Sequence, residues 1–352
     1  MTTSDQSPMD RYARQTRYAP IGEEGQQRLM DASVLVCGCG ALGSASAEWI
    51  VRAGVGRVRI VDRDVLELHN LQRQSLYNEA DVAARLPKAV AAANHLRLIN
   101  STVSIESVVA DVTHRNVAEL CDGVDLVVDG TDNFETRLLL NDFCWSEETP
   151  WVYGGVIGAE GRVMPITPPA SACLACLVPE APRPGETPTC DTAGVLGPAV
   201  GVVASRQAIE AIKLLTGAVD AVAHGLTVFD LWTNRTRRLS VPRDADCRCC
   251  VRQEFDWLDG RLGSEAVYLC GRGAVQITPQ ESTERIDLTA MRARLAPLGE
   301  VEGNDFLIRV KLRPEPGGKQ HDVTLFADGR AIIGGVEDEA EARTVWAKGL
   351  GG

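Results

Sequence analysis

The sequence predicts an α/β protein, in which a doubly wound and mostly parallel sheet is followed by a small α+β domain. Short runs of β-branched and apolar residues alternate with longer stretches of helical periodicity, and this alternation is typical of βαβ units. A glycine-rich turn joins the first predicted strand to the first buried helix. Aromatic residues make up only 5% of the 352 residues while glycine occurs 33 times, which favours tight strand-to-helix turns over an aromatic-rich β-sandwich.

The first predicted elements form a strand–turn–helix–strand unit. Residues 33–37 (SVLVC) are predicted to form a buried strand, GCGALG follows at 38–43, and a helix continues to Ala53. A second strand, RVRIVD, ends at Asp62. Because a glycine turn leads into the helix and an acid ends the next strand, the unit is typical of a Rossmann-like dinucleotide-binding domain.

The remaining elements follow from the same periodicities. In the first part of the chain we expect helices within 79–99 and at 133–146, strands at 103–109, 124–129 and within 151–166, a loop at 178–192, and a buried helix at 197–216 that ends at Gly217. A second composition begins near residue 260, with strands expected in 266–278, 305–313 and 321–334 and helices at 287–295 and 337–349. The predicted organisation is an N-terminal arm and helix (1–30), a nucleotide-binding domain (31–258) and a small α+β domain (264–352).

The charge and the cysteines restrict the possible partners and the compartment. The formal net charge is −12, from 36 basic and 48 acidic residues, which argues against a general binder of nucleic acids or anionic membranes. No run of about 18 apolar residues occurs, and the N-terminus lacks the apolar stretch of a secretory signal. Eleven cysteines without a signal indicate a reducing compartment, so we expect a cytoplasmic protein.

Arginines recur at every third position near the N-terminus, at Arg11, Arg14 and Arg17 within RYARQTRY. This spacing predicts that the three side chains lie along one helical face. A solvated helix face is one interpretation, and a basic stripe with a function is the other.

The glycine turn predicts a nucleotide site. Gly38, Gly40 and Gly43 allow a tight turn, a close approach of the backbone to a phosphate and close packing of the helix, whose N-terminus supplies free N–H groups. Asp62 stands where a carboxylate accepts hydrogen bonds from ribose hydroxyls. These residues alone indicate an adenine nucleotide, with NAD as the first candidate.

The residues that follow Asp62 favour a triphosphate over NAD. Charged and amide side chains come next, at Asp64, Asn70, Gln72, Arg73 and Gln74. Arg73 and Lys88 supply positive charge of the kind needed around phosphates. Asp132, in the motif DGTDN, follows another strand at the carboxyl edge of the sheet, where an acid beside phosphates is suited to hold Mg²⁺.

The motifs along the chain resemble those of the ThiF/MoeB adenylyltransferases, which are relatives of the ubiquitin-activating enzymes. They are GCGALG, VDRD, HNLQRQ, the segment around Lys88 and DGTDN, and the resemblance covers residues 10–250. One departure is Ala41, which stands where the family has a glycine. Because alanine adds only a methyl group at a position that opens a helix, we expect nucleotide binding to be retained.

The resemblance also implies roles for individual residues. It implies that Asp62 binds the ribose, that Asp132 holds Mg²⁺, and that Arg14 reaches into the site of the other subunit of a homodimer. Asn70, Arg73 and Lys88 are implied to contact the phosphates of ATP. The implied catalytic residues are Arg14, Arg73, Lys88, Asp132 and Cys190. The implied ATP-binding residues are Gly38, Gly40, Ala41, Gly43, Asp62, Asp64, Asn70, Arg73, Gln74, Lys88, Asp132 and Asn133.

Two cysteine pairs have the spacing of a structural zinc site. They are Cys173-x-x-Cys176 and Cys247-x-x-Cys250, and four thiolates leave no position for a catalytic water. Cys249 makes the register ambiguous, but only Cys247 and Cys250 have the required separation. A redox role for either pair is the alternative. The remaining cysteines outside the loop, at 37, 39, 121, 144 and 270, are expected to be small, partly buried hydrophobic residues.

The activity that the resemblance implies is ATP-dependent adenylation of the C-terminal Gly-Gly carboxylate of a small ubiquitin-like sulfur-carrier protein, with release of pyrophosphate. The carboxylate is ionised at neutral pH, so the reaction needs cationic groups and Mg²⁺ rather than a general base. The segments YLCGRGAVQI and VTLFADGRAIIGGVEDEAEARTVW resemble the extension of some bacterial thiamine-type members. Thiamine biosynthesis is therefore favoured, and the small subunit of molybdopterin synthase is the alternative substrate.

The motifs also bear on two other classes of function. A NAD-dependent oxidoreductase is disfavoured by HNLQRQ and TDN, and a non-catalytic scaffold is disfavoured because every residue of the nucleotide site is present. Cys270 lacks the arginine-containing anion loop of a fused sulfurtransferase, so we expect the sulfur donor to be a separate persulfide protein.

Cys190 ends the predicted loop in TPTCDTAGVLGP, just before the long helix. A helix N-terminus favours a thiolate, and the position matches the family's cysteine that can form a covalent link to the activated carrier. A covalent intermediate, a supporting role in the loop and an incidental residue are the three interpretations.

Overall fold

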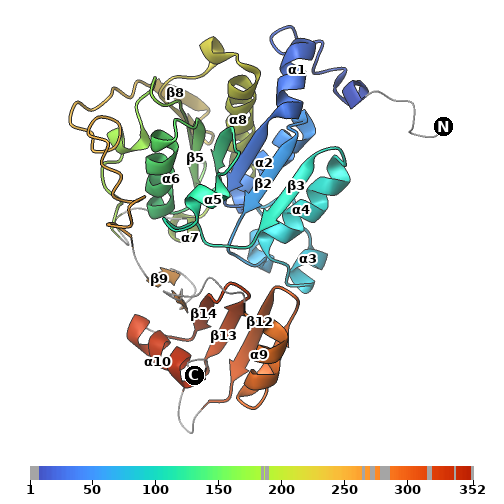
Figure 1. Cartoon of the computed structure of the whole chain (residues 1–352), viewed down its shortest axis with the longest axis vertical. Helices are drawn as coiled ribbons and strands as arrows, with labels where there is room; N and C mark the ends of the chain where they lie inside the picture. The colour runs from blue at the N-terminus through green and yellow to red at the C-terminus, as the bar shows by residue number, and fades with distance from the viewer. Residues whose placement is uncertain are drawn as a thin grey trace, which may run out of the picture. The chain divides into compact units, whose positions relative to one another are not determined.

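The computed structural model describes residues 8–183, 186, 190–263, 266–269, 274–277, 286–314, 319–336 and 338–349. The chain divides into two compact units, Met1–Leu262 and Gly263–Gly352, each with its own hydrophobic core (Figure 1). The N-terminal segment thus belongs to the same unit as residues 31–258. No helix within these described ranges combines the length and the apolar character needed to cross a membrane.

The first unit is built on an eight-stranded sheet with the order β3-β2-β1-β4-β5-β6-β7-β8. Its strands are β1 (Ser33–Cys37), β2 (Arg57–Val61), β3 (Ser104–Val108), β4 (Leu126–Asp129), β5 (Trp151–Ile157), β6 (Glu160–Ile166), β7 (Leu226–Asp230) and β8 (Arg235–Leu239). The pairings from β3 through β5 are parallel, and those from β5 to β8 are antiparallel. This arrangement confirms the predicted doubly wound, mostly parallel sheet, in which the central strand β1 is buried at every position.

Helices cover both faces of this sheet (Figure 1). They are η2 (Pro8–Tyr12), α1 (Gly22–Asp31), α2 (Ala41–Ala53), η3 (Leu68–Asn70), α3 (Glu79–Ala83), α4 (Lys88–Ile99), α5 (Val117–Leu120), α6 (Phe134–Ser146), η4 (Leu174–Cys176), α7 (Cys190–Ala193), α8 (Gly197–Thr216) and η5 (Val219–Ala221). Apolar residues of α1, α2, α4 and α8 form one core, and those of α5 and α6 form a second core on the other face. The predicted end of α8 is confirmed, because Gly217 takes a left-handed φ of 79° at the C-cap.

The prediction that the three N-terminal arginines share a helical face is wrong. The short 3-10 helix η2 ends at Tyr12, and turns follow until α1 begins at Gly22. Tyr12 is only 4% exposed, and its hydroxyl accepts a hydrogen bond of 2.8 Å from the amide of Asn100. Arg11 donates to the main-chain oxygen of Ile99 at 3.1 Å. These contacts fix the segment against the body of the unit, and a continuous helix over residues 11–17 does not form.

The second unit contains a six-stranded sheet with the order β11-β12-β13-β14-β10-β9, in which every pairing is antiparallel. Helices α9 and α10 pack on the same apolar face, which confirms the α+β prediction. The predicted strand regions 266–278 and 321–334 each contain two strands, and β11 was not predicted. The elements are β9 (Ala266–Leu269), β10 (Ala274–Ile277), α9 (Leu288–Leu295), β11 (Gly299–Gly303), β12 (Leu307–Leu312), β13 (Asp322–Phe326), β14 (Ala331–Gly334) and α10 (Glu339–Gly349).

Candidate active site and metal centre

Three glycines bring the glycine turn and the loop after β4 into direct backbone contact. Gly38 has a left-handed φ of 82°, and a Cβ atom built there would lie 2.8 Å from the carbonyl carbon of Gly130. A Cβ on Gly43 would lie 1.8 Å from the main-chain oxygen of Gly38, and one on Gly130 would lie 2.3 Å from that same oxygen. The two loops can therefore approach this closely only without side chains at the three positions.

The N-terminus of α2 is open in the sense that no side chain caps it. Gly40 is its N-cap and supplies no side-chain cap, so the first N–H groups of the helix have no side chain to satisfy them. Ala41 is the first helical residue and is half-buried, and its methyl group is accommodated at this helix-opening position. The turn thus presents backbone donors at the edge of the sheet where a phosphate would bind.

Asp62 follows β2 and is fixed beside this turn. One carboxylate oxygen accepts a hydrogen bond of 2.6 Å from the N–H of Cys39, and the other accepts one of 2.7 Å from the N–H of Asp64. Asp62 is 9% exposed, and this burial raises its pKa, although the charge of Lys88 and the two N–H donors act to lower it. The carboxylate therefore has a defined orientation at the end of the strand.

Lys88 is the first residue of α4 and is 5% exposed. Its Nζ lies 2.8 Å from a carboxylate oxygen of Asp64, and its N–H donates to the main-chain oxygen of Asp64 at 2.9 Å. Burial acts to lower the pKa of Lys88, but the charges of Asp64 and Asp62 outweigh it and raise the pKa above the ordinary value. Lys88 is therefore held as a cation close to the glycine turn.

Tyr77, which belongs to none of the sequence motifs, links the glycine turn to the first residue of α4. The hydroxyl of Tyr77 lies 2.6 Å from the main-chain oxygen of Cys39 and 3.2 Å from that of Lys88. Tyr77 is 7% exposed, so its hydroxyl needs such acceptors. No motif marks this position in the sequence, because a lone tyrosine is common in any core.

The HNLQRQ segment contains a structural asparagine, Asn70, and a buried glutamine, Gln74, whose side-chain oxygen has no partner among the described residues. Asn70 is 1% exposed, and its side-chain oxygen accepts a hydrogen bond of 3.0 Å from the N–H of Glu67, which shapes the turn. Gln74 is 2% exposed, and its side-chain oxygen has no hydrogen-bond partner in the described part of the chain. Its amide nitrogen is the nearest atom, at 3.8 Å, to a Cβ built on Gly40. A buried amide oxygen without a partner, close to an uncapped helix N-terminus, fits a site that binds a polar ligand. Arg73 is half-buried and donates to the main-chain oxygen of His69 at 2.9 Å.

The loop between β4 and α6 carries Asp132 and Asn133. Asp132 is exposed, and its charge is among those that raise the pKa values of Lys88 and of the half-buried Arg63, after the larger contributions of nearer groups. An exposed carboxylate at a strand edge, among cations that would also face phosphates, has the hard oxygen donors that Mg²⁺ requires. Asn133 caps α6, because its side-chain oxygen accepts a hydrogen bond of 2.8 Å from the N–H of Thr136.

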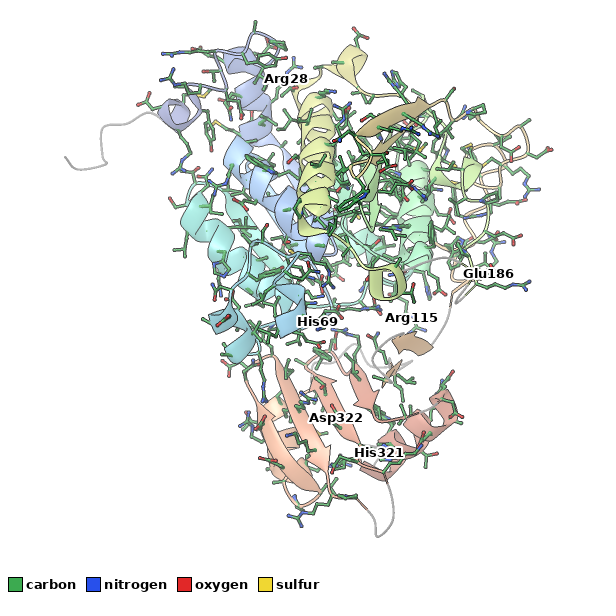
Figure 2. The ribbon with its side chains drawn as sticks, turned by 180° about the vertical axis from the view of Figure 1, so that it is seen from behind. Arg28, His69, Arg115, Glu186, His321 and Asp322 are labelled. Atoms are coloured by element: carbon green, nitrogen blue, oxygen red, sulfur yellow. The ribbon has the colours of Figure 1, made fainter. Side chains whose placement is uncertain are left out.

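Arg14 does not join this site within one chain. It is exposed and has no hydrogen-bond or ion-pair partner among the described residues. Its segment lies beside α1, and Figure 2 shows Arg28 of α1 and His69 at opposite ends of the first unit. Because His69 is in contact with Arg73, the N-terminal segment lies far from the predicted phosphate-binding residues of its own chain.

The four cysteines of the two predicted pairs form one cluster. Their sulfur atoms all lie within 4.8 Å of one another, with separations of 3.5 Å between Cys173 and Cys247 and 3.4 Å between Cys176 and Cys250. Tetrahedral Zn²⁺ with thiolate ligands requires sulfur separations of about 3.8 Å, so the cluster could hold the metal. Cys249 is fully buried but lies outside the cluster, and its sulfur is 3.2 Å from the amide nitrogen of Asn141.

Two of the predicted cysteine assignments lie partly or wholly outside the described residues. The backbone of Cys190 begins the short helix α7, but its side chain is not among the residues described. Cys270 lies outside them altogether. Cys37, Cys39, Cys121 and Cys144 are buried free thiols, in agreement with the prediction that they pack as small hydrophobic residues.

Taken together, the fold and the site define a nucleotide-binding α/β protein with a cysteine cluster that could bind a metal. The chain belongs to the ThiF family, whose model matches residues 12–250.

The comparisons with individual proteins agree with this assignment. The chain is 43% identical over 345 residues to the sulfur carrier protein ThiS adenylyltransferase of Bacillus subtilis (strain 168), a match that covers 97% of this chain and 99% of that relative. It is 37% identical to the adenylyltransferase and sulfurtransferase MOCS3 of Anopheles gambiae, over 71% of this chain and 56% of that relative. The crystal structure of E. coli MccB matches with a TM-score of 0.61 at 20% identity over 70% of this chain and 74% of that one, which supports the fold alone.

Proposed function

We propose that this chain is an ATP-dependent adenylyltransferase that activates the C-terminal Gly-Gly carboxylate of a small ubiquitin-like sulfur-carrier protein. The observation that carries the proposal is the arrangement at one edge of the sheet. The open N-terminus of α2, the fixed carboxylate of Asp62 and the buried cation Lys88 lie together there. The match to the Bacillus subtilis relative along nearly the whole chain supports the same activity.

The chemistry requires little beyond charge and position. The carrier carboxylate is already ionised, attacks the α-phosphorus of ATP and displaces pyrophosphate, so no general base is needed. Lys88 and Arg73 would stabilise the negative charge that develops on the phosphate oxygens and on the leaving group. Asp132 is the residue that would hold Mg²⁺, which neutralises phosphate charge when bound. Asp62 would fix the ribose, and Gln74 offers an amide to the nucleotide.

The test is ATP–pyrophosphate exchange with purified carrier proteins. We expect exchange that requires both Mg²⁺ and a carrier with an intact Gly-Gly end, and that is lost when the last glycine of the carrier is removed. Exchange that does not need a carrier, or no exchange with any Gly-Gly carrier, contradicts the proposal. Quenching of NADH fluorescence by the protein would instead favour the oxidoreductase, which the membership of the ThiF family disfavours.

We further propose that the carrier belongs to thiamine biosynthesis and that a separate protein donates the sulfur as a persulfide. The Bacillus subtilis relative named for ThiS matches both units of this chain, whereas the match to the Anopheles gambiae relative covers 71% of the chain. The molybdopterin synthase small subunit is the alternative substrate. Exchange assays with both carriers separate the two, because only the true substrate should support exchange at low carrier concentration.

A homodimer is the assembly that we propose. Arg14 is exposed, and Figure 2 shows Arg28 of the neighbouring helix α1 at the opposite end of the first unit from His69, so Arg14 would act at the site of a second copy. An apolar strip on α2 and α8 fits such a contact, since Trp49, Val202 and Ile209 are 50%, 42% and 47% exposed. These side chains border a hollow of about 540 Å³. Light scattering should give a dimer for the natural chain and a monomer for Ile209→Glu.

The cysteine cluster is proposed to bind one structural Zn²⁺ per chain. Four thiol groups from segments about 70 residues apart converge, and the described part of the chain adds no fifth ligand to the group, which suits a closed site. Such a site keeps its thiols only under reducing conditions, and we propose the cytoplasm as the compartment.

A further inference from the structure

The guanidinium group of Arg137 lies under the loop that carries Asp132, and neither the sequence motifs nor the mechanism above uses it. Its Nε donates to a carboxylate oxygen of Asp129 at 3.1 Å. Its Nη2 donates to the main-chain oxygen of Thr131 at 2.6 Å and to that of Gly154 on β5 at 3.0 Å. One side chain thus contacts the end of β4, the loop and the neighbouring strand.

Arg137 is held in a single position. It is 7% exposed, and the rings of Phe134 and Tyr153 each lie with their centroids 5.2 Å from its central carbon. Burial acts to lower the pKa of Arg137, but the charge of Asp129 outweighs it and raises the pKa. Asp129 itself is fully buried, so the negative charge of Asp129 and the positive charge of Arg137 compensate each other.

Asp129 connects this pair to the shape of the loop. Its second carboxylate oxygen accepts hydrogen bonds from the N–H of Thr131 at 2.9 Å and from the Thr131 hydroxyl at 2.7 Å. Arg137 therefore contacts the carbonyl of Thr131, and Asp129 contacts its N–H and hydroxyl. Hydrogen bonds to both Arg137 and Asp129 therefore fix the main chain at Thr131. Thr131 directly precedes Asp132, whose carboxylate would face the metal.

We propose that Arg137 is a positioning residue, which sets the Asp132 loop so that its carboxylate meets the Mg²⁺ of bound ATP. This inference rests on the proposed function, because it assumes that Mg–ATP is the ligand of the site. Lysine cannot replace Arg137, since one ammonium group cannot reproduce the planar fork that reaches a carboxylate and two carbonyls at once. Loss of such an outer contact typically weakens metal binding about 10–100-fold.

The test compares Arg137→Lys with a matched control, Arg59→Lys. Arg59 also joins a carboxylate to backbone carbonyls, with 2.7 Å to Glu106 and 2.6 Å to the main-chain oxygen of Leu120. The Leu120 carbonyl belongs to α5 and not to the loop that carries Asp132. The two variants therefore make the same chemical change in the same unit.

The readouts are the Mg²⁺ concentration that gives half-maximal binding of a fluorescent ATP analogue, the KM and kcat of pyrophosphate exchange, and the melting temperature. We expect Arg137→Lys to raise the half-saturating Mg²⁺ concentration at least about tenfold, while Arg59→Lys leaves it unchanged. A lower melting temperature in both variants with no change in the Mg²⁺ requirement overturns the proposal and leaves Arg137 a structural residue.

A second variant and a binding assay without carrier protein complete the test. If Arg137→Lys does not fold, Thr131→Val takes its place, because it removes the hydroxyl group that donates a hydrogen bond to Asp129. We expect this variant also to raise the half-saturating Mg²⁺ concentration. An unchanged Mg²⁺ concentration overturns the proposal. The binding assay needs no carrier protein. A natural chain that binds Mg–ATP but shows no carrier-dependent exchange therefore contradicts the proposed function, while the Arg137 comparison is still read from binding.

Discussion

The ammonium group of Lys88 and the carboxylate of Asp64 form an ion pair of 2.8 Å at the edge of the sheet that carries the glycine turn. The pair is asymmetric, because the side chain of Lys88 is 6% exposed and that of Asp64 is 25% exposed. Asp64 thus keeps a buried cation charged and oriented before a nucleotide arrives. Because the ammonium group of Lys88 is already removed from water in the folded chain, a phosphate group that replaces Asp64 as its partner does not bear the free-energy cost of that desolvation.

The first prediction concerns pH. The pKa of Lys88 is raised in the folded chain, so its pairing stabilises the protein fully below the unfolded value of about 10.4 and is lost as the pH rises through the folded value. Lys88→Met should lower the free energy of unfolding throughout pH 6–9, and the deficit should shrink only above about pH 10.4. Urea unfolding across this range measures it. Arg343→Met, which breaks an exposed pair on α10, should have little effect at any pH. A deficit that disappears between pH 7 and 9 contradicts the prediction.

The second prediction concerns the glycine turn. Gly43→Ala places a methyl carbon against the main-chain oxygen of Gly38, so the turn must open. We expect a loss of stability of about 1–3 kcal/mol and a loss of ATP binding, measured by thermal unfolding and nucleotide titration. Ala41→Gly, the matched change at the same turn, should keep ATP binding and cost no more than about 1 kcal/mol. Equal ATP binding by natural chain and Gly43→Ala would show that the turn does not contact the nucleotide.

The third prediction concerns the metal. Cys250→Ser should remove zinc and lower the melting temperature by more than about 5 °C, because metal binding contributes to the free energy of folding. Cys249→Ser should keep one zinc per chain, since that sulfur lies outside the cluster. Metal analysis of the purified variants decides the assignment. It is wrong if Cys250→Ser retains the metal or Cys249→Ser loses it.

The fourth prediction concerns the second subunit. Arg14→Ala should leave folding and zinc content intact but reduce pyrophosphate exchange about 10²–10³-fold, the usual effect of losing one preorganised charge contact. Mixing Arg14→Ala with Lys88→Ala should restore part of the activity, because a mixed dimer contains one site with both residues intact. Subunit exchange is verified by mass spectrometry of differently tagged chains. Exchange of subunits without any recovery of activity excludes a composite site.

The fifth prediction concerns Cys190. Cys190→Ser should keep pyrophosphate exchange but impair delivery of sulfur to the carrier if the thiol forms the covalent link. Mass spectrometry of the natural chain with carrier, ATP and a persulfide donor should then detect a reducible adduct that is missing in Cys190→Ser. A full yield of thiocarboxylate from Cys190→Ser eliminates the covalent intermediate and leaves the supporting or incidental interpretation.

The elements that the sequence predicts best are those whose environment is uniform along their length. Strand β1 is apolar at nearly every position because it is buried on both faces, so its pattern stands out. Strand β8 reads RTRRL and is exposed throughout, because it forms the edge of the sheet, and no hydrophobic pattern marks it. The helix expected over residues 11–17 does not form, because a tertiary contact outweighs the local pattern there. Tyr12 is buried against the body of the unit, and the spacing of the arginines carries no sign of this contact.

The residues of the candidate site also differ in how well the sequence predicts their roles. The cysteine register could be predicted because metal geometry limits the spacing between ligands. The use of the Asn133 side chain as a helix cap could not, since an amide beside a strand end suits a ligand equally well. Arg137 was missed because its partners are two carbonyls and one acid from three elements, and a single sequence contains no trace of backbone acceptors.

The close contact of Gly38, Gly43 and Gly130 has a consequence for sequence variation. A Cβ atom on Gly43 or on Gly130 would meet the carbonyl oxygen of Gly38, and one on Gly38 would meet the carbonyl group of Gly130. The first side chain introduced at any of the three positions must therefore push the two loops apart, and a second side chain then enters space that is already open. The energetic effects of substitutions at these positions are therefore expected to be strongly non-additive, with the double variant less unstable than the sum of the singles. Descendants of this chain that lose one of these glycines can lose the others at little extra cost, so the three are expected to persist or to vanish together.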